Sequence, residues 1–201
     1  MSTLIKPFRA LRPDNSDALS VIAPPYDVIS REEALDIAKN KPSNFLHISR
    51  PEIDFPLNVD PYSQEIYEKG KENLYKLIDD SILRQTDKPS FYVYSMRSDR
   101  HEQTGLAAVA SVEAYENNKI RKHELTKPLK ENDRVKNIKS LMAQTGPVLC
   151  SYKSDKRLKI IFESIKNSLP IIEVEDTYNV LHKIWKVDEE NKIKEISSFF
   201  N

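Results

Sequence analysis

Apolar residues recur at the three-to-four spacing of an amphipathic helix in five stretches of the chain. Ser30 and Glu33 form the sequence signature of a capping box in front of the first stretch, and Asp60 followed by Pro61 is typical of the start of the second. The predicted helices cover residues 31–40, 61–78, 135–142, 156–165 and 192–199. Their apolar faces need a second layer of structure to pack on.

Runs rich in β-branched and aromatic residues lie between these helices and predict strands. They cover residues 4–11, 19–23, 44–48, 90–97, 106–115, 148–152, 171–174 and 180–187. The polar segment 98–105 joins two of them into a hairpin, which indicates antiparallel pairing. Because strands alternate with helices while one pair is a hairpin, we expect an α+β fold, with a mixed or mainly antiparallel sheet and helices packed on it.

The composition is that of a globular protein. With 201 residues, 39% hydrophobic and 31% charged, the chain can bury a sizeable core, and we expect a single domain over residues 1–201. The chain has neither a signal-peptide pattern nor a run of about 18 apolar residues, so we expect a cytoplasmic protein with no membrane partner. The 31 lysine and arginine residues balance 31 aspartate and glutamate residues, which argues against nucleic acid as a partner.

The glycine and cysteine counts exclude several classes of site. Three scattered glycines, Gly70, Gly105 and Gly146, cannot form the glycine-rich phosphate loops of dinucleotide-binding or P-loop enzymes. The single cysteine, Cys150, permits no internal disulfide and no cysteine cluster for zinc. It lies in the apolar run 147–152, and we expect it to be buried.

The densest group of polar residues spans 121–134, where we expect the connection between a strand and a helix. Arg134, Lys130 and Thr126 supply donors there, and a helix start supplies free amide groups, so the segment could hold a phosphate or a carboxylate. We therefore predict a small anionic ligand as the partner and these three residues as its contacts. The competing interpretation is a solvated helix start with Asn132 and Asp133 as its cap.

The same segment contains candidates for acid–base chemistry. His123 and Glu124 are adjacent and could transfer a proton, with Asp133 as a further carboxylate, and we predict these three as the catalytic residues. They could instead hold a divalent metal. A single histidine without a spaced partner is weak evidence for metal, so we assign no metal site.

Two other segments hold polar groups beside prolines. In the turn 23–28, Pro24 and Pro25 would fix the positions of Tyr26 and Asp27, which we predict as ligand contacts. The alternative is that the prolines only connect a strand to the next helix. Arg50 follows His47 and Ser49 at the end of the predicted strand 44–48, and it is our third ligand-contact candidate.

Several short segments together resemble a family. They are Pro7-Phe-Arg-Ala-Leu-Arg-Pro13, Ala23-Pro-Pro-Tyr-Asp-Val28, Asn44-Phe-Leu-His-Ile-Ser-Arg-Pro51, Thr104-Gly-Leu106, His123-Glu-Leu-Thr126 with Asp133-Arg134, and Thr145-Gly-Pro147. In this order they resemble a conserved bacterial and archaeal family known as a domain of unknown function, number ten-fifteen, and loosely labelled ParB-like. The resemblance implies that this chain is the N-terminal part of a longer family protein.

The family's likeness to ParB and free-serine-kinase proteins implies a nucleotide-dependent phosphotransfer enzyme, with a nucleotide and magnesium as the implied cofactors. We therefore expect part of a small-molecule enzyme that binds a nucleotide or another phosphorylated ligand. The alternative is a binding or regulatory module without catalysis, associated with nucleic acid as the ParB-like label implies. The sequence determines neither the substrate nor the oligomeric state.

Overall fold

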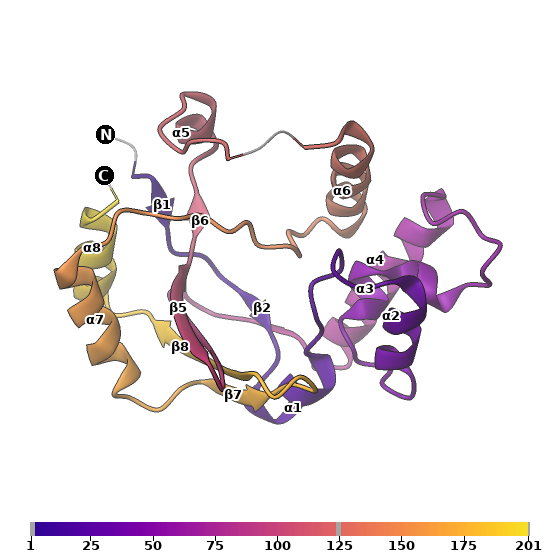
Figure 1. The fold of residues 1–201 in the computed structure, drawn as a ribbon, viewed down its shortest axis with the longest axis horizontal. Helices are drawn as coiled ribbons and strands as arrows, with labels where there is room; N and C mark the ends of the chain where they lie inside the picture. The colour runs from indigo at the N-terminus through magenta and orange to yellow at the C-terminus, as the bar shows by residue number, and fades with distance from the viewer. Residues whose placement is uncertain (1–2, 124–125, 201) are drawn as a thin grey trace. The chain divides into compact units, whose positions relative to one another are not determined.

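The computed structural model describes residues 3–123 and 126–200, and within these residues the protein has an α+β fold (Figure 1). The helices are α1 (Asn15–Val21), α2 (Arg31–Ala38), α3 (Leu46–Ser49), the 3-10 helix η1 (Pro51–Asp54), α4 (Gln64–Asp79), α5 (Val112–Glu116), α6 (Pro128–Leu141), α7 (Lys156–Lys166) and α8 (Glu190–Ser198). The strands are β1 (Ile5–Lys6), β2 (Leu11–Arg12), β3 (Arg84–Gln85), β4 (Phe91–Ser98), β5 (His101–Ala107), β6 (Val109–Ala110), β7 (Ile172–Glu175) and β8 (Leu181–Val187). None of these helices is both long enough and apolar enough to cross a membrane.

The chain divides into two compact units, and neither unit is continuous in sequence. Unit 1 contains residues 1–19, 84–124 and 151–201, and unit 2 contains residues 20–83 and 125–150. Each unit therefore depends on segments that lie far apart along the chain.

Unit 1 is built on a four-stranded antiparallel sheet with the strand order β5-β4-β8-β7. Val93 in the middle of β4 lies opposite Leu106 of β5 and Trp185 of β8. Helices α7 and α8 cover one face of this sheet (Figure 1). The buried residues between them are Phe91, Val93, Leu158, Ile161, Phe162, Ile165, Trp185, Val187 and Ile196. The amphipathic pattern of α7 matches this packing, because the apolar face of the helix packs on apolar strand residues.

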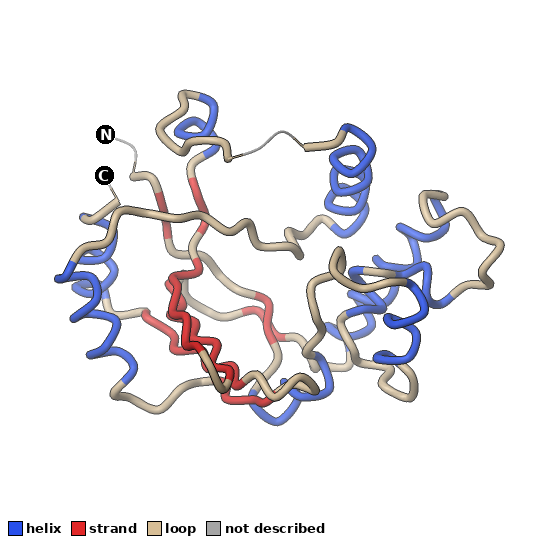
Figure 2. The backbone as a smooth tube through the Cα atoms, viewed as in Figure 1, coloured by secondary structure: helices blue, strands red, loops and turns tan. Residues whose placement is uncertain are grey.

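The described residues of unit 2 form helices and loops without a strand (Figure 2). Helix α2 begins with the predicted capping box, in which Ser30 Oγ accepts from the Glu33 amide and the Glu33 carboxylate accepts from the Ser30 amide. Helix α4 approaches α3 and η1 closely at Gly70, where an added Cβ would lie 3.1 Å from Pro51 Cγ. Helix α6 packs on α4, and Ser140 Oγ donates to the Tyr67 carbonyl at 3.0 Å.

The structure confirms helices close to all five predicted positions, although α4 starts at Gln64 after Ser63 and not at Pro61. The prediction of strands at 90–97, 171–174 and 180–187 is also confirmed. The hairpin is present, but Ser98 of β4 pairs with His101, so residues 101–105, which were predicted as part of a long loop, belong to β5 and only residues 99–100 form the turn.

Three strand predictions are wrong, although all three segments are rich in strand-forming residues. Residues 19–21 belong to α1, and residues 46–48 belong to α3, where the buried Asn44 side chain accepts from the Leu46 amide. The run 148–152 forms no strand in the described structure. The prediction for residues 106–115 is correct only in part, since β5 ends at Ala107 and α5 begins at Val112. Cys150 is exposed, which corrects the expectation that it is buried.

Candidate functional site

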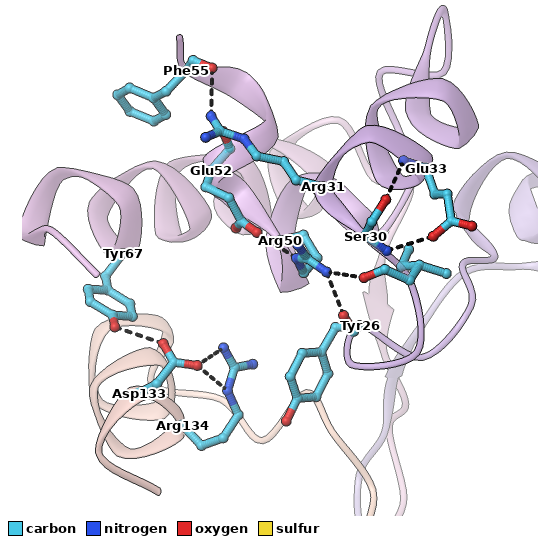
Figure 3. A network of polar contacts seen from close by, with 11 residues as sticks. Tyr26, Ser30, Arg31, Glu33, Arg50, Glu52, Phe55, Tyr67, Asp133 and Arg134 are labelled. Atoms are coloured by element: carbon cyan, nitrogen blue, oxygen red, sulfur yellow. Dashed lines mark hydrogen bonds and ion pairs between the residues drawn. The ribbon is translucent and has the colours of Figure 1, made fainter. Parts of the chain in front are cut away.

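The turn with Pro24 and Pro25 is held in place by Arg50. Arg50 Nη1 donates to the carbonyl oxygens of Tyr26 and Ile29, each at 2.8 Å, and Arg50 Nε donates to Glu52 Oε1 at 2.5 Å. The Glu52 residue is buried, so this ion pair lies largely out of water. Arg50 therefore fixes the backbone on which the Tyr26 ring is mounted (Figure 3).

Asp133 connects two helices through its carboxylate. Its Oδ1 accepts from the Tyr67 hydroxyl at 2.8 Å, and its Oδ2 accepts from Arg134 Nε at 2.9 Å and Nη2 at 2.6 Å. Tyr67 is on α4, whereas Asp133 and Arg134 are on α6. Figure 3 shows the carboxylate between the phenol and the guanidinium.

The Arg134 guanidinium also lies over an aromatic ring. Its central carbon is 4.2 Å from the centroid of the Tyr26 ring, within the range of a cation–π contact. Among the described residues, none accepts a hydrogen bond from Arg134 Nη1, and the side chain keeps 28% of its surface exposed. We call Tyr26, Tyr67, Asp133 and Arg134 the arginine cluster; all four belong to unit 2.

Burial and the neighbouring carboxylate shape the electrostatics of the cluster. Burial raises the pKa of Tyr67 strongly, and the hydrogen bond to Asp133 raises it further, because a tyrosinate would face an anion. Tyr67 therefore stays protonated and continues to donate to Asp133. This donation and the two bonds from Arg134 keep the carboxylate in one orientation.

The start of α6 differs from the expected position. The helix begins at Pro128 after Lys127, so Asp133 lies inside the helix and is not its cap. Lys130 is exposed in the first turn of the helix. It lies four positions before Arg134, which places both cations on the same side of the helix. Thr126 precedes the helix and is exposed, with its hydroxyl donating to Glu131 at 3.1 Å.

The other predicted site residues are not part of the arginine cluster. His123 is exposed in unit 1, and no residue that the structure describes makes a hydrogen bond or ion pair with it. Glu124 lies outside the described residues. Asp27 is exposed in the turn next to Tyr26. Within residues 3–123 and 126–200, no group of three or more His, Cys, Asp or Glu side chains is arranged to hold a metal ion.

A second polar network lies between α3, η1 and α4. His47 Nδ1 and Asp54 Oδ1 are 2.6 Å apart, and the Asn73 amide donates to Asp54 Oδ2 at 2.8 Å and to the His47 carbonyl at 2.7 Å. The hydrogen bond with Asp54 raises the pKa of His47. Burial alone would raise the pKa of Asp54, but the bonds from His47 and Asn73 outweigh it and lower that pKa.

This network lines an open pocket of about 370 Å³ within unit 2. The residues around it are Pro42, Asn44, His47, Ile48, Asp54, Lys69, Asn73, Lys76 and Leu77. The pocket is concave, and its wall combines polar and charged residues with the apolar Pro42, Ile48 and Leu77, a mixture that small-ligand sites also use.

Sequence reasoning missed most partners in both networks. Tyr67 fits the apolar stripe of α4, and its hydroxyl bond to a residue 66 positions away has no local signature. Asp54 and Asn73 lie on different elements and gave no motif. The one sequence signal for the network of His47, Asp54 and Asn73 was that His47 lies close along the chain to Arg50, a predicted ligand contact.

These features define an α+β protein with a preorganised arginine on a tyrosine ring and no glycine-rich phosphate loop. The chain belongs to the family described as "Protein of unknown function (DUF1015)", which matches residues 5–201. The predicted family membership is thus confirmed. No curated protein and no solved structure gives a significant match to the chain.

Proposed function

We propose that this protein binds a phosphorylated small molecule, such as a nucleotide or a sugar phosphate, at the arginine cluster, and that it forms part of a small-molecule enzyme. One observation carries the proposal. The Arg134 guanidinium is fixed on the Tyr26 ring by Asp133 while its Nη1 remains without a described partner.

A fixed guanidinium suits phosphate for geometric and entropic reasons. Its planar array of donors matches the oxygens of phosphate, and a side chain that is already oriented loses little freedom when a ligand binds. Lys130, one turn earlier on α6, adds a second positive charge on the same side. The amide groups of the first turn of α6 have no side-chain cap, so they are further donors for an anion.

The hydrogen bonds of the Asp133 carboxylate argue against the predicted role of this residue in acid–base catalysis. Because both its oxygens accept bonds from Tyr67 and Arg134, we assign Asp133 a positioning role. His123 and Glu124 remain the predicted groups for proton transfer. Asp27, exposed beside Tyr26, remains a predicted ligand contact.

Calorimetric titration with ATP, ADP and glucose 6-phosphate, each with and without magnesium, tests the proposal. We expect at least one of them to bind, and Arg134→Gln to weaken it at least tenfold, because a charge-assisted hydrogen bond contributes about 1.5–3 kcal/mol. Lys130→Gln should weaken binding about threefold, since an exposed charge contributes less. Tyr67→Phe should also weaken binding by releasing the Asp133 carboxylate.

Lys139→Gln is the matched control, because Lys139 is exposed on the same helix and the substitution removes the same charge. It should leave the affinity within about twofold of the wild type. Circular dichroism of each variant checks that the fold is retained. If no phosphorylated compound binds, or if Lys139→Gln weakens binding as much as Arg134→Gln, the proposal is wrong.

A further inference from the structure

The pocket between α3, η1 and α4 has an unusual helix face on one side. Lys69, Asn73 and Lys76 recur at intervals of four and three residues along α4, so they form one stripe, and all three line the pocket. A helix normally places apolar residues where it faces its neighbours. Here the stripe beside the buried Leu77 is polar and cationic, with Lys69 and Asn73 half-buried and Lys76 exposed.

The charges around the pocket do not cancel. Asp54 is paired with His47, whose pKa is raised by that hydrogen bond, so the two together approach neutrality. Lys69 pairs with Glu72 at 3.1 Å, and the Glu72 side chain is 69% exposed. Lys76 forms no ion pair with any residue in the described part of the chain. The pocket therefore carries one uncompensated positive charge, that of Lys76, beside a Lys69 whose partner lies mostly in water.

The floor of the pocket is held in a fixed shape. The side chains of His47 and Asp54 are only 21% and 18% exposed, and the Asn73 amide donates one hydrogen to Asp54 Oδ2 and the other to the His47 backbone carbonyl. The cationic groups available to a ligand are the Lys76 ammonium and the Lys69 ammonium, whose partner Glu72 is largely exposed.

We infer that this pocket is a second ligand site, separate from the arginine cluster, which binds a small oxyanion, either a carboxylate or a phosphate, between Lys69 and Lys76. Its volume of about 370 Å³ is near the lower end of the range for small-molecule sites, so a small metabolite fits better than a nucleotide. The apolar wall of Ile48, Leu77 and Pro42 would contact the carbon skeleton of such a molecule.

Nuclear magnetic resonance titration with inorganic phosphate and, separately, with succinate tests the inference and distinguishes the two ligand chemistries. We expect one of these probes to shift the side-chain signals of His47 and Asn73. The double variant Lys69→Gln/Lys76→Gln should weaken that binding at least about tenfold, because it removes both cationic contacts.

The matched control is Lys71→Gln/Lys139→Gln, which removes the same total charge from exposed positions outside the pocket. It should change the affinity by less than about twofold, as should Arg134→Gln, which alters only the arginine cluster. The inference is overturned if neither probe shifts the His47 and Asn73 signals at about 10 mM, or if the control weakens binding as much as the pocket variant. Neither outcome depends on whether a nucleotide binds at the arginine cluster.

Discussion

Arg50 and Arg134 have the same side chain and different surroundings. Arg50 donates to Glu52 and to two carbonyl oxygens, so its hydrogen bonds serve the turn that carries Tyr26. Arg134 is oriented by Asp133 and Tyr26, donates to no carbonyl oxygen of a described residue, and keeps 28% of its side chain exposed against 17% for Arg50. At the scale of the residue, the partners of a side chain separate a structural arginine from a candidate ligand contact.

The His47–Asp54 pair should make stability depend on pH. Because the pKa of His47 is raised in the folded protein, its contribution to the free energy of unfolding is complete below the ordinary pKa of 6.5. This contribution is lost as the pH rises through the raised pKa, where the folded protein loses the proton. The lowered pKa of Asp54 means that its contribution is complete above the ordinary value of 3.8 and is lost as pH falls through the lowered value. The pair therefore stabilises the protein most between these two ordinary values.

Urea unfolding of the wild type and His47→Gln measures this effect. We expect the variant to be less stable by about 1.5–3 kcal/mol near pH 5, and the difference to shrink near pH 9 as the wild type loses the charge on His47. His101→Gln is the control, because His101 is exposed on β5. An equal difference between wild type and His47→Gln at both pH values would contradict the prediction.

For single helices and strands, local sequence patterns predicted the structure correctly where no contact with a distant residue overrode them. The capping box of Ser30 and Glu33 specifies the start of α2 through bonds three residues apart. The run 44–48 has strand-forming residues, but Asn44 donates to the Ile22 carbonyl and accepts from the Leu46 amide, and the chain becomes helical. In the second case, the Asn44 side chain depends on the Ile22 carbonyl oxygen, which is far away in the sequence. A local sequence pattern could not predict this contact.

Ser30→Ala should lower the unfolding free energy by about 1 kcal/mol, because it removes the acceptor for the Glu33 amide. Ser63→Ala is the natural comparison, since Ser63 precedes α4 but makes no capping hydrogen bond with its side chain. Its effect should stay below about 0.5 kcal/mol. Chemical denaturation of both variants measures the difference, and equal losses would show that the Ser30 cap contributes nothing specific.

In the molecule as a whole, both compact units are assembled from segments that are separated in the sequence. The expected single domain over residues 1–201 stays a prediction. Charge is the other global property. The 31 basic and 31 acidic residues leave no net charge to attract a polyanion. The cationic groups that we assign to ligands are local to unit 2.

This balance predicts that the protein does not retain nucleic acid. In a gel-shift experiment with a mixed-sequence duplex at about 50 mM salt, we expect no retardation, because nonspecific binding needs several lysine or arginine contacts to phosphates. Retardation that weakens steeply as salt rises would instead support the alternative of a nucleic-acid-associated module. The measurement is independent of the small-molecule titrations.

The order of the residues was enough to predict the α+β class, the helices with amphipathic faces and the strands of the central hairpin, because these depend on periodicity and on caps a few residues apart. It also indicated Tyr26 and Arg134 as site residues, without their contact. The packing of the helices was needed to see that Tyr67 donates to Asp133, and that His47 pairs with Asp54 beside Asn73 of α4. Such contacts depend on how separate elements pack, and the positions of their residues along the chain carry no signal of it.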